Sequence, residues 1–170
     1  MILETLLAVV ALLAPVRACS ITAASALPEL TGTWQVLVIS GMDRPRPDSA
    51  LARSVITPEL QGCLLREQLR MLTGTYEEMI LWGVNGADRG IQRVLTHSQH
   101  GRLGLYDGRR TGDTVALRQQ PIPGQASSIV VEHRVVFRDH DHFSIASLLS
   151  NDGGQTWQML SQRDYQRGAS

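Results

Sequence analysis

Two ionisable side chains, Glu67 and His133, fall where a β-strand pattern puts apolar residues. Glu67 shares a face with Leu65 and Leu69, and His133 shares a face with Val135. A carboxylate and an imidazole in an enclosed site can act as general acid and base, or can orient a bound ligand. Because an unpaired buried carboxylate is costly, each group needs a partner. Three interpretations remain open: an internally satisfied pair or triad with an arginine, a ligand site, and an acid–base pair.

The histidines invite a second kind of chemistry, metal binding. His140 and His142 alternate, which would put both imidazoles on one face of a strand, and His97 and His100 form a second pair. However, His140 and Asp141 lie in a polar turn between two expected strands, and no third ligand is set by the spacing. We interpret this stretch as a solvated turn, and we predict neither a metal site nor a cofactor.

A third motif, Ser150 to Trp157, matches the Asp-box hairpin S-x-D-x-G-x-T-W. In such a hairpin the Asp152 carboxylate accepts backbone N–H groups, Gly154 permits positive φ, and Trp157 packs over the turn. These are structural roles. A single copy without an internal repeat argues against a sialidase propeller.

The elements that must position these residues are strands. Alternating or β-branched runs, separated by Gly-, Pro- and Asn-rich turns, predict strands at about 34–39, 52–57, 64–71, 76–84, 91–96, 101–106, 114–119, 129–138, 143–149 and 156–165. The stretch 107–112 is expected to be a polar turn. A rival helix starting at Pro58 would use Leu60, Leu64 and Leu72, but the alternation after Leu64 favours a strand.

About ten strands with short connections and no βαβ spacing indicate an all-β, antiparallel, up-and-down barrel, since closure removes the sheet edges. Gly32 and Trp34 open the first strand, and Trp34 is expected to plug one end. An arginine from the last strand should cover Trp34 through a cation–π contact. Arg163 is the better candidate than Arg167, because it shares a face with Trp157.

Length and charge restrict the function. The chain has 170 residues, which is one domain by length, and its sixteen basic residues balance sixteen acidic ones. All the basic residues are arginine, and no basic cluster suggests nucleic acid as a partner.

The N-terminus resembles a removable leader. Residues 1–16 are apolar apart from two positions, too few for a membrane span, and Ala24-Ser25-Ala26 supplies an A-x-A cleavage pattern. We therefore expect a leader over 1–26 and one barrel domain over 27–170, secreted or periplasmic, with no transmembrane helix. Lipid anchoring at Cys19 is less favoured, because Arg17 fits a lipobox poorly. If cleavage removes Cys19, Cys63 is a lone, small buried hydrophobe.

Four segments in order resemble a bacterial lipocalin-like domain of unknown function: 30–34 (L-T-G-T-W), 62–67 (G-C-x-x-x-E), 150–157 and the closing Y-x-R of 165–167. The resemblance implies a lipocalin-like barrel and brings no assigned activity. The G-T-W opening is also similar to that of haem-binding nitrobindin-like barrels. Their Gly- and Tyr-Pro-rich continuation is missing after Trp34, which argues against haem.

The sequence thus predicts an exported protein that binds a small apolar or amphipathic molecule inside a barrel. Glu67 and His133 would orient the ligand. The expected lining is Trp34, Leu65, Glu67, Leu69, Val131, His133, Val135, Phe143 and Trp157. The alternatives are an enzyme that uses Glu67 and His133 as acid and base, and a filled barrel that acts through its outer surface.

Overall fold

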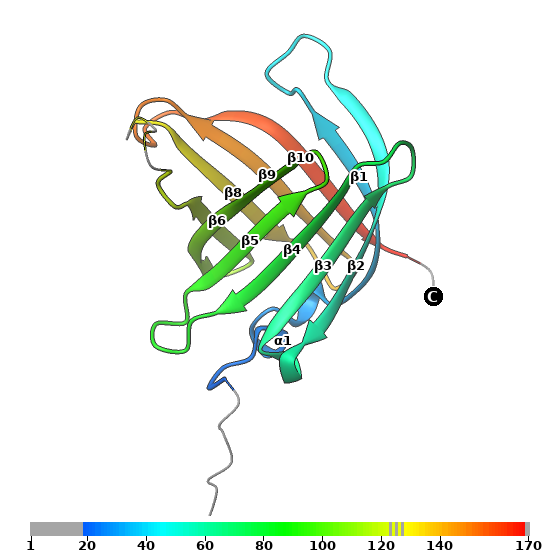
Figure 1. Ribbon diagram of the computed structural model, residues 1–170, viewed down its shortest axis with the longest axis vertical. Helices are drawn as coiled ribbons and strands as arrows, with labels where there is room; N and C mark the ends of the chain where they lie inside the picture. The colour runs from blue at the N-terminus through cyan, green and yellow to red at the C-terminus, as the bar shows by residue number, and fades with distance from the viewer. Residues whose placement is uncertain (1–18, 123, 125, 127, 169–170) are drawn as a thin grey trace, which may run out of the picture.

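The computed structural model describes residues 19–122, 124, 126 and 128–168. Ten antiparallel strands form a closed barrel in which each strand pairs with its neighbours in sequence and β1 pairs with β10 (Figure 1). This confirms the predicted all-β, up-and-down, lipocalin-like barrel. The strands are β1 (Gly32–Ser40), β2 (Asp48–Glu59), β3 (Leu64–Met71), β4 (Glu77–Val84), β5 (Ile91–His97), β6 (His100–Thr111), β7 (Thr114–Gln119), β8 (Val130–Phe137), β9 (His142–Ser150) and β10 (Gln158–Arg167). The described helical turns are α1 (Ala23–Ala26), η1 (Pro28–Leu30) and η2 (Leu60–Gly62).

The strand prediction for residues 64–71 is confirmed, and the rival helix is wrong. Leu65 and Leu69 are buried while Arg66 and Arg70 are exposed, as alternation in a strand requires. Only η2 interrupts the chain between β2 and β3.

The expected turn at 107–112 is also wrong, because β6 continues through it to Thr111. Asp107 pairs with Arg118 of β7, and its carboxylate accepts hydrogen bonds from Gln92 and Gln120. At Gly108 an added Cβ would collide with the backbone of Ala116 in β7. The glycine therefore serves close strand approach, whereas the sequence pattern resembled a turn.

One end of the barrel is closed by α1 and η1, which lie across it (Figure 1). Ala23, Leu27 and Leu30 are fully buried there and join the barrel core. Trp34 Nε1 donates a hydrogen bond to the carbonyl of Leu30 at 2.8 Å, and the indole meets the Phe143 ring edge-on at 4.8 Å. Trp34 therefore closes this end of the barrel, as predicted, together with the segment that precedes β1.

The arginine that covers Trp34 is Arg167, so the expectation for Arg163 is wrong. The Arg167 guanidinium lies 4.3 Å from the Trp34 ring and donates to the carbonyls of Thr31 and His140. The register explains the exchange: Arg167 is directly opposite Trp34, whereas Arg163 is opposite Val38, further from the closed end.

Gly32 leaves the space that this arrangement needs. Its φ is +140°, and a Cβ at this position would collide with the Arg167 guanidinium. Glycine is therefore required where the first strand passes beneath the arginine.

Cys19 and Cys63 form a disulfide that ties the segment before α1 to the turn before β3. Cys63 was expected to be unpaired only if leader cleavage removed Cys19. In the structure Cys19 is present and pairs with Cys63. Residues 1–18 of the predicted leader lie outside the described residues, whereas residues 19–26 belong to the closed end of the barrel.

Replacing Arg167 with alanine should destabilise the barrel by about 2–3 kcal/mol, because the cation–π contact is lost and the partly buried carbonyl of Thr31 loses its donor. Urea unfolding followed by tryptophan fluorescence measures this change. The control is Arg44→Ala. The Arg44 side chain is 67% exposed and forms only a long ion pair with Asp48, at 3.9 Å. The unfolding free energy of this variant should stay within about 0.5 kcal/mol of the wild-type value. Equal stabilities of the two variants would show that Arg167 does not hold the closed end.

Candidate functional site

Four inward-facing apolar side chains at the end of the barrel opposite α1 are incompletely buried. Most inward-facing apolar side chains near the closed end are fully buried, although Val84 and two alanines of α1 are only partly buried there. At the opposite end Val38, Met71, Leu95 and Val131 are partly buried while still packing on the core. These four come from β1, β3, β5 and β8, so they surround the lumen. We define the cup as this apolar rim together with the polar groups that lie below it.

Glu67 lies in the lumen and is completely buried. One carboxylate oxygen accepts hydrogen bonds from Ser54 Oγ and Tyr165 Oη, both at 2.9 Å. The other oxygen accepts from Trp82 Nε1 at 3.2 Å. The contact with Tyr165 joins β3 to β10 across two intervening strands. Three neutral donors therefore satisfy this carboxylate.

Glu78 and Arg163 form a second polar bridge, from β4 to β10. Both guanidinium Nη atoms donate to the carboxylate at 2.6 Å, and the Tyr76 hydroxyl donates to it as well. Burial would raise the pKa of Glu78, but the charge and hydrogen bonds of Arg163 outweigh burial and hold that pKa at about 2. The ion pair also raises the pKa of Arg163 despite the burial of the guanidinium.

His133 belongs to a third group, which joins β8 to β5 and β6. Arg93 Nη1 lies 2.6 Å from His133 Nδ1, and the Tyr106 ring stacks on the imidazole at 4.0 Å. The Arg93 guanidinium also lies 4.9 Å from the Trp82 ring. Burial, together with the positive charges of Arg93 and Arg163, lowers the pKa of His133 well below its usual value. The imidazole is therefore neutral.

Glu67 and His133 both point into the lumen but have separate partners, and no hydrogen bond joins them in the described structure. Trp82 connects their surroundings, since it donates to Glu67 and lies beneath Arg93. An acid–base pair is therefore not assembled, because each group is occupied by different neighbours.

Most of the expected lining is buried in the core: Trp34, Leu65, Leu69, Val135 and Phe143. Val131 lies at the rim. The prediction that Trp157 lines the lumen is wrong. Trp157 does not join the core cluster, and its ring lies 5.8 Å from the exposed Arg118 guanidinium, on the outside of the barrel wall.

The Asp-box turn holds Trp157 there. The Asp152 carboxylate accepts the N–H groups of Gln155 and Thr156, both at 2.9 Å. Gly154 has a φ of +96°, and a Cβ added to it would lie 3.3 Å from the Trp157 ring. These contacts build the turn between β9 and β10 at the open end.

Sequence reasoning missed Arg93, Glu78, Tyr106 and Tyr165. Arg93 could have been found by alternation, because it lies between the inward residues Ile91 and Leu95. Such a pattern places a residue in the lumen but cannot say which opposite strand it meets.

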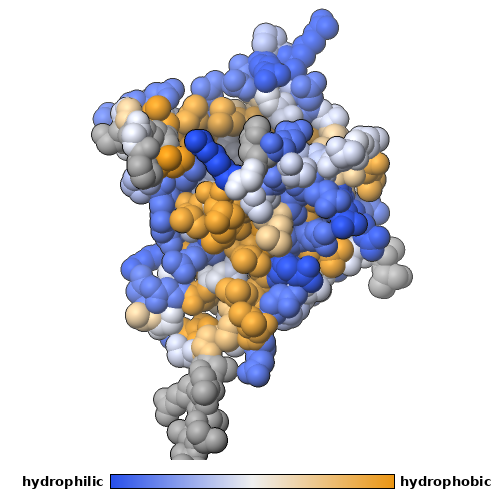
Figure 2. Space-filling view, in the orientation of Figure 1, coloured by the Kyte–Doolittle hydropathy of each residue, from blue (hydrophilic) through white to orange (hydrophobic). Residues whose placement is uncertain are grey.

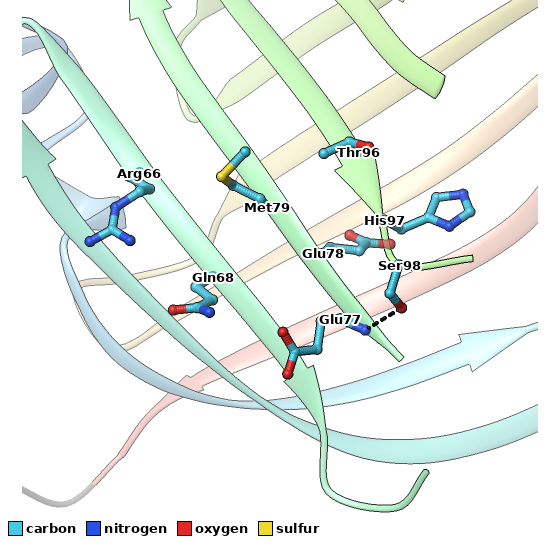
Figure 3. Close-up of a pocket in the computed structure, with 8 residues that line it drawn as sticks. All are labelled: Arg66, Gln68, Glu77, Glu78, Met79, Thr96, His97 and Ser98. Atoms are coloured by element: carbon cyan, nitrogen blue, oxygen red, sulfur yellow. Dashed lines mark hydrogen bonds between the residues drawn. The ribbon is translucent and has the colours of Figure 1, made fainter. Parts of the chain in front are cut away.

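The outer wall is different in character. A hollow of about 280 Å³ lies over β3, β4 and β5, where Ser98 Oγ accepts the Glu77 N–H at 3.1 Å (Figure 3). Apolar surface is also visible in Figure 2, and Met79, Leu103 and Leu105 are exposed apolar residues of β4 and β6. These features lack the combination of apolar walls and buried donors that marks the cup.

The histidine-rich turn between β8 and β9 is tied by local contacts. His140 Nδ1 lies 3.0 Å from Asp141, and His142 Nδ1 lies 2.9 Å from Asp139. Among the described residues, no group of three or more His, Cys, Asp or Glu side chains is arranged to hold a metal ion. Likewise, no helix in the described ranges is long and apolar enough to cross a membrane.

Comparisons with known proteins support the fold. No protein-family model and no curated protein matches the sequence. Among solved structures, Rv2717c from M. tuberculosis is similar with a TM-score of 0.56 and 19% identity, covering 86% of this chain and 97% of that one. An S-type phycobiliprotein lyase from Guillardia theta is similar with a TM-score of 0.53 and 13% identity, covering 90% and 96%. At these identities the likeness shows the barrel fold alone.

The Glu78–Arg163 pair should make the barrel acid-sensitive. Because the folded pKa of Glu78, about 2, lies below its ordinary value of 4.5, its stabilisation is complete above pH 4.5 and is lost as the pH falls towards 2. The full loss is about 3 kcal/mol. Unfolding free energies of the wild type and of Glu78→Gln, measured in urea between pH 7 and pH 2, test this. The variant should be less stable at pH 7 and show a shallower decline.

The matched control for this experiment is Glu77→Gln, on the outer face of the same strand, where the Glu77 side chain is 48% exposed. This variant should keep the wild-type pH dependence. If the unfolding free energy of Glu78→Gln fell with pH as steeply as that of the wild type, the Glu78–Arg163 pair would not be the source of the acid sensitivity.

Proposed function

We propose that this protein binds a small apolar or amphipathic molecule in the cup at the open end of the barrel. The observation that carries the proposal is the group of four inward-facing apolar side chains, Val38, Met71, Leu95 and Val131, that remain partly exposed at the end away from α1, whereas most of the core near α1 is fully buried. Partly exposed apolar walls above a few buried polar groups are typical of small-molecule sites.

The closed end supports the same function. Trp34, Phe143 and Tyr165 fill the lumen there with aromatic rings in mutual contact. A ligand therefore has one entrance, at the rim. The similar phycobiliprotein lyase is an example of a protein with this fold that has a named activity. That activity is a property of the lyase.

A rim substitution tests the cup. Leu95→Trp, on the inward face of β5, should fill the cup and weaken binding by at least about tenfold. Its matched control is Val94→Trp, the next residue, which faces outward and should bind as wild type does. Ligands that copurify are first identified by native mass spectrometry before and after denaturation, and their affinities for each variant are then measured by calorimetry. Equal affinities for both variants would move the site away from the cup.

We also propose that the chain is exported and that its leader is removed before Cys19. A disulfide between Cys19 and Cys63 is typical of oxidising compartments. Removal after Ala26 would detach Cys19 and the buried Ala23 from the closed end, so the packing favours an upstream cleavage point.

Intact mass of the exported protein tests this proposal. The mature chain should contain Cys19 and should gain the mass of two hydrogen atoms on reduction. Reduction should also lower the unfolding free energy by about 2–4 kcal/mol, because the bond closes a 44-residue separation. A mature chain that begins at Leu27 with a free Cys63 thiol would refute it.

A further inference from the structure

Arg93 is a buried cation that no carboxylate contacts directly among the described residues. Its side chain is 1% exposed, and its one hydrogen bond in the described structure is to His133 Nδ1. Its Nε is buried and has no hydrogen-bond partner. No carboxylate oxygen of the described residues lies within 4.0 Å of the guanidinium nitrogens. A charge in this position is costly unless something pairs with it.

The two lumen carboxylates are already occupied. Glu78 accepts both of its short ionic hydrogen bonds from Arg163. Glu67 accepts from three neutral donors, including Tyr165 and Trp82. Arg93 therefore contacts an aromatic face and a neutral imidazole, and its charge reaches Glu78 only at longer range.

His133 adds a second donor. A guanidinium has no acceptor, so His133 Nδ1 must accept the hydrogen bond from Arg93, and the imidazole proton is on Nε2. The lowered pKa of His133 agrees with this neutral form. The Tyr106 ring, stacked on the imidazole, brings a phenolic hydroxyl to the same region. Donors thus outnumber acceptors around Arg93.

This group faces the cup. On β8, Val131 precedes His133 on the inward face, and on β7 Gln119 is directly opposite Tyr106. Val131 and Gln119 line a hollow of about 190 Å³ at the open end. The donors of Arg93, His133 and Tyr106 therefore lie next to the space where a ligand would enter.

We propose that Arg93, His133 and Tyr106 recognise a carboxylate head group on a ligand whose apolar body lies against the rim. This inference rests on the proposed function, and it names the chemical class of the ligand. The carboxylate accepts from the Arg93 guanidinium, from His133 Nε2–H and from the Tyr106 hydroxyl. Charge-assisted hydrogen bonds of this kind are the strong ones in proteins.

Matched ligand pairs test the proposal. Straight-chain carboxylates from hexanoate to dodecanoate, and the alcohols of the same chain lengths, are titrated by calorimetry below their micelle concentrations. The carboxylate of the best-fitting length should bind at least about tenfold more tightly than its alcohol. Arg93→Met, which keeps the length of the side chain and removes its charge, should reduce this ratio to less than about threefold.

A stability measurement separates recognition from a structural role. Because no carboxylate of the described residues contacts Arg93, and its charge acts on Glu78 only at longer range, Arg93→Met should lower the thermal midpoint far less than loss of a direct ion pair does. Arg163→Met should lower the midpoint, since it strands Glu78. Tyr106→Phe keeps the ring stack and should reduce the carboxylate preference by about threefold, which keeps the proposal testable if Arg93→Met does not fold. The control for surface charge is Arg102→Met, an exposed position on β6.

The outcomes are distinct. Loss of the carboxylate preference in Arg93→Met, with retained alcohol binding, supports the inference. Equal binding of carboxylate and alcohol by the wild type overturns the inference and leaves the proposed function standing. Binding of neither ligand class overturns both. A preference that survives in both Arg93→Met and Tyr106→Phe overturns the assignment of the site to these residues.

Discussion

The backbone pairing of β1 with β10 is the constraint on which the structure depends. It closes the sheet, so that every strand has two neighbours and the alternation of side chains becomes a division between lumen and solvent. Closure also brings Arg163 and Tyr165 of the last strand to face Glu78 and Glu67 from the middle of the chain. Without closure these groups would be exposed on the face of an open sheet, and neither the cross-lumen contacts nor a cup would exist.

The lumen is unusual because polar bridges cross it. Glu67 with Tyr165, Glu78 with Arg163 and Arg93 with His133 each join strands that are not neighbours. The first two are balanced internally, through neutral donors in one case and an opposite charge in the other. The third is not, since a cation meets a neutral imidazole. The first two bridges therefore stabilise the barrel, and the third is the one for which we propose ligand recognition.

The two ends of the barrel are built differently. At one end α1, the Cys19–Cys63 disulfide and Arg167 over Trp34 close the lumen with buried contacts. At the other end the wall strands continue past the core and leave apolar side chains partly exposed. This asymmetry is the basis for the single ligand entrance that we propose.

Alternation in the sequence predicts the strands, the all-β class and the inward orientation of Glu67 and His133, because a period of two is a local property of each strand. Closure, disulfide pairing and partner choice are not local. Arg167 rather than Arg163 covers Trp34 because of the register between β1 and β10, and Trp157 lies outside because of how the Asp152 turn folds. Arg93 meets His133, and Tyr165 meets Glu67, only because the closed barrel carries distant strands to opposite walls. Alternation predicts which side chains of a strand face the lumen, whereas the partners that they meet there depend on strand register and on closure of the barrel.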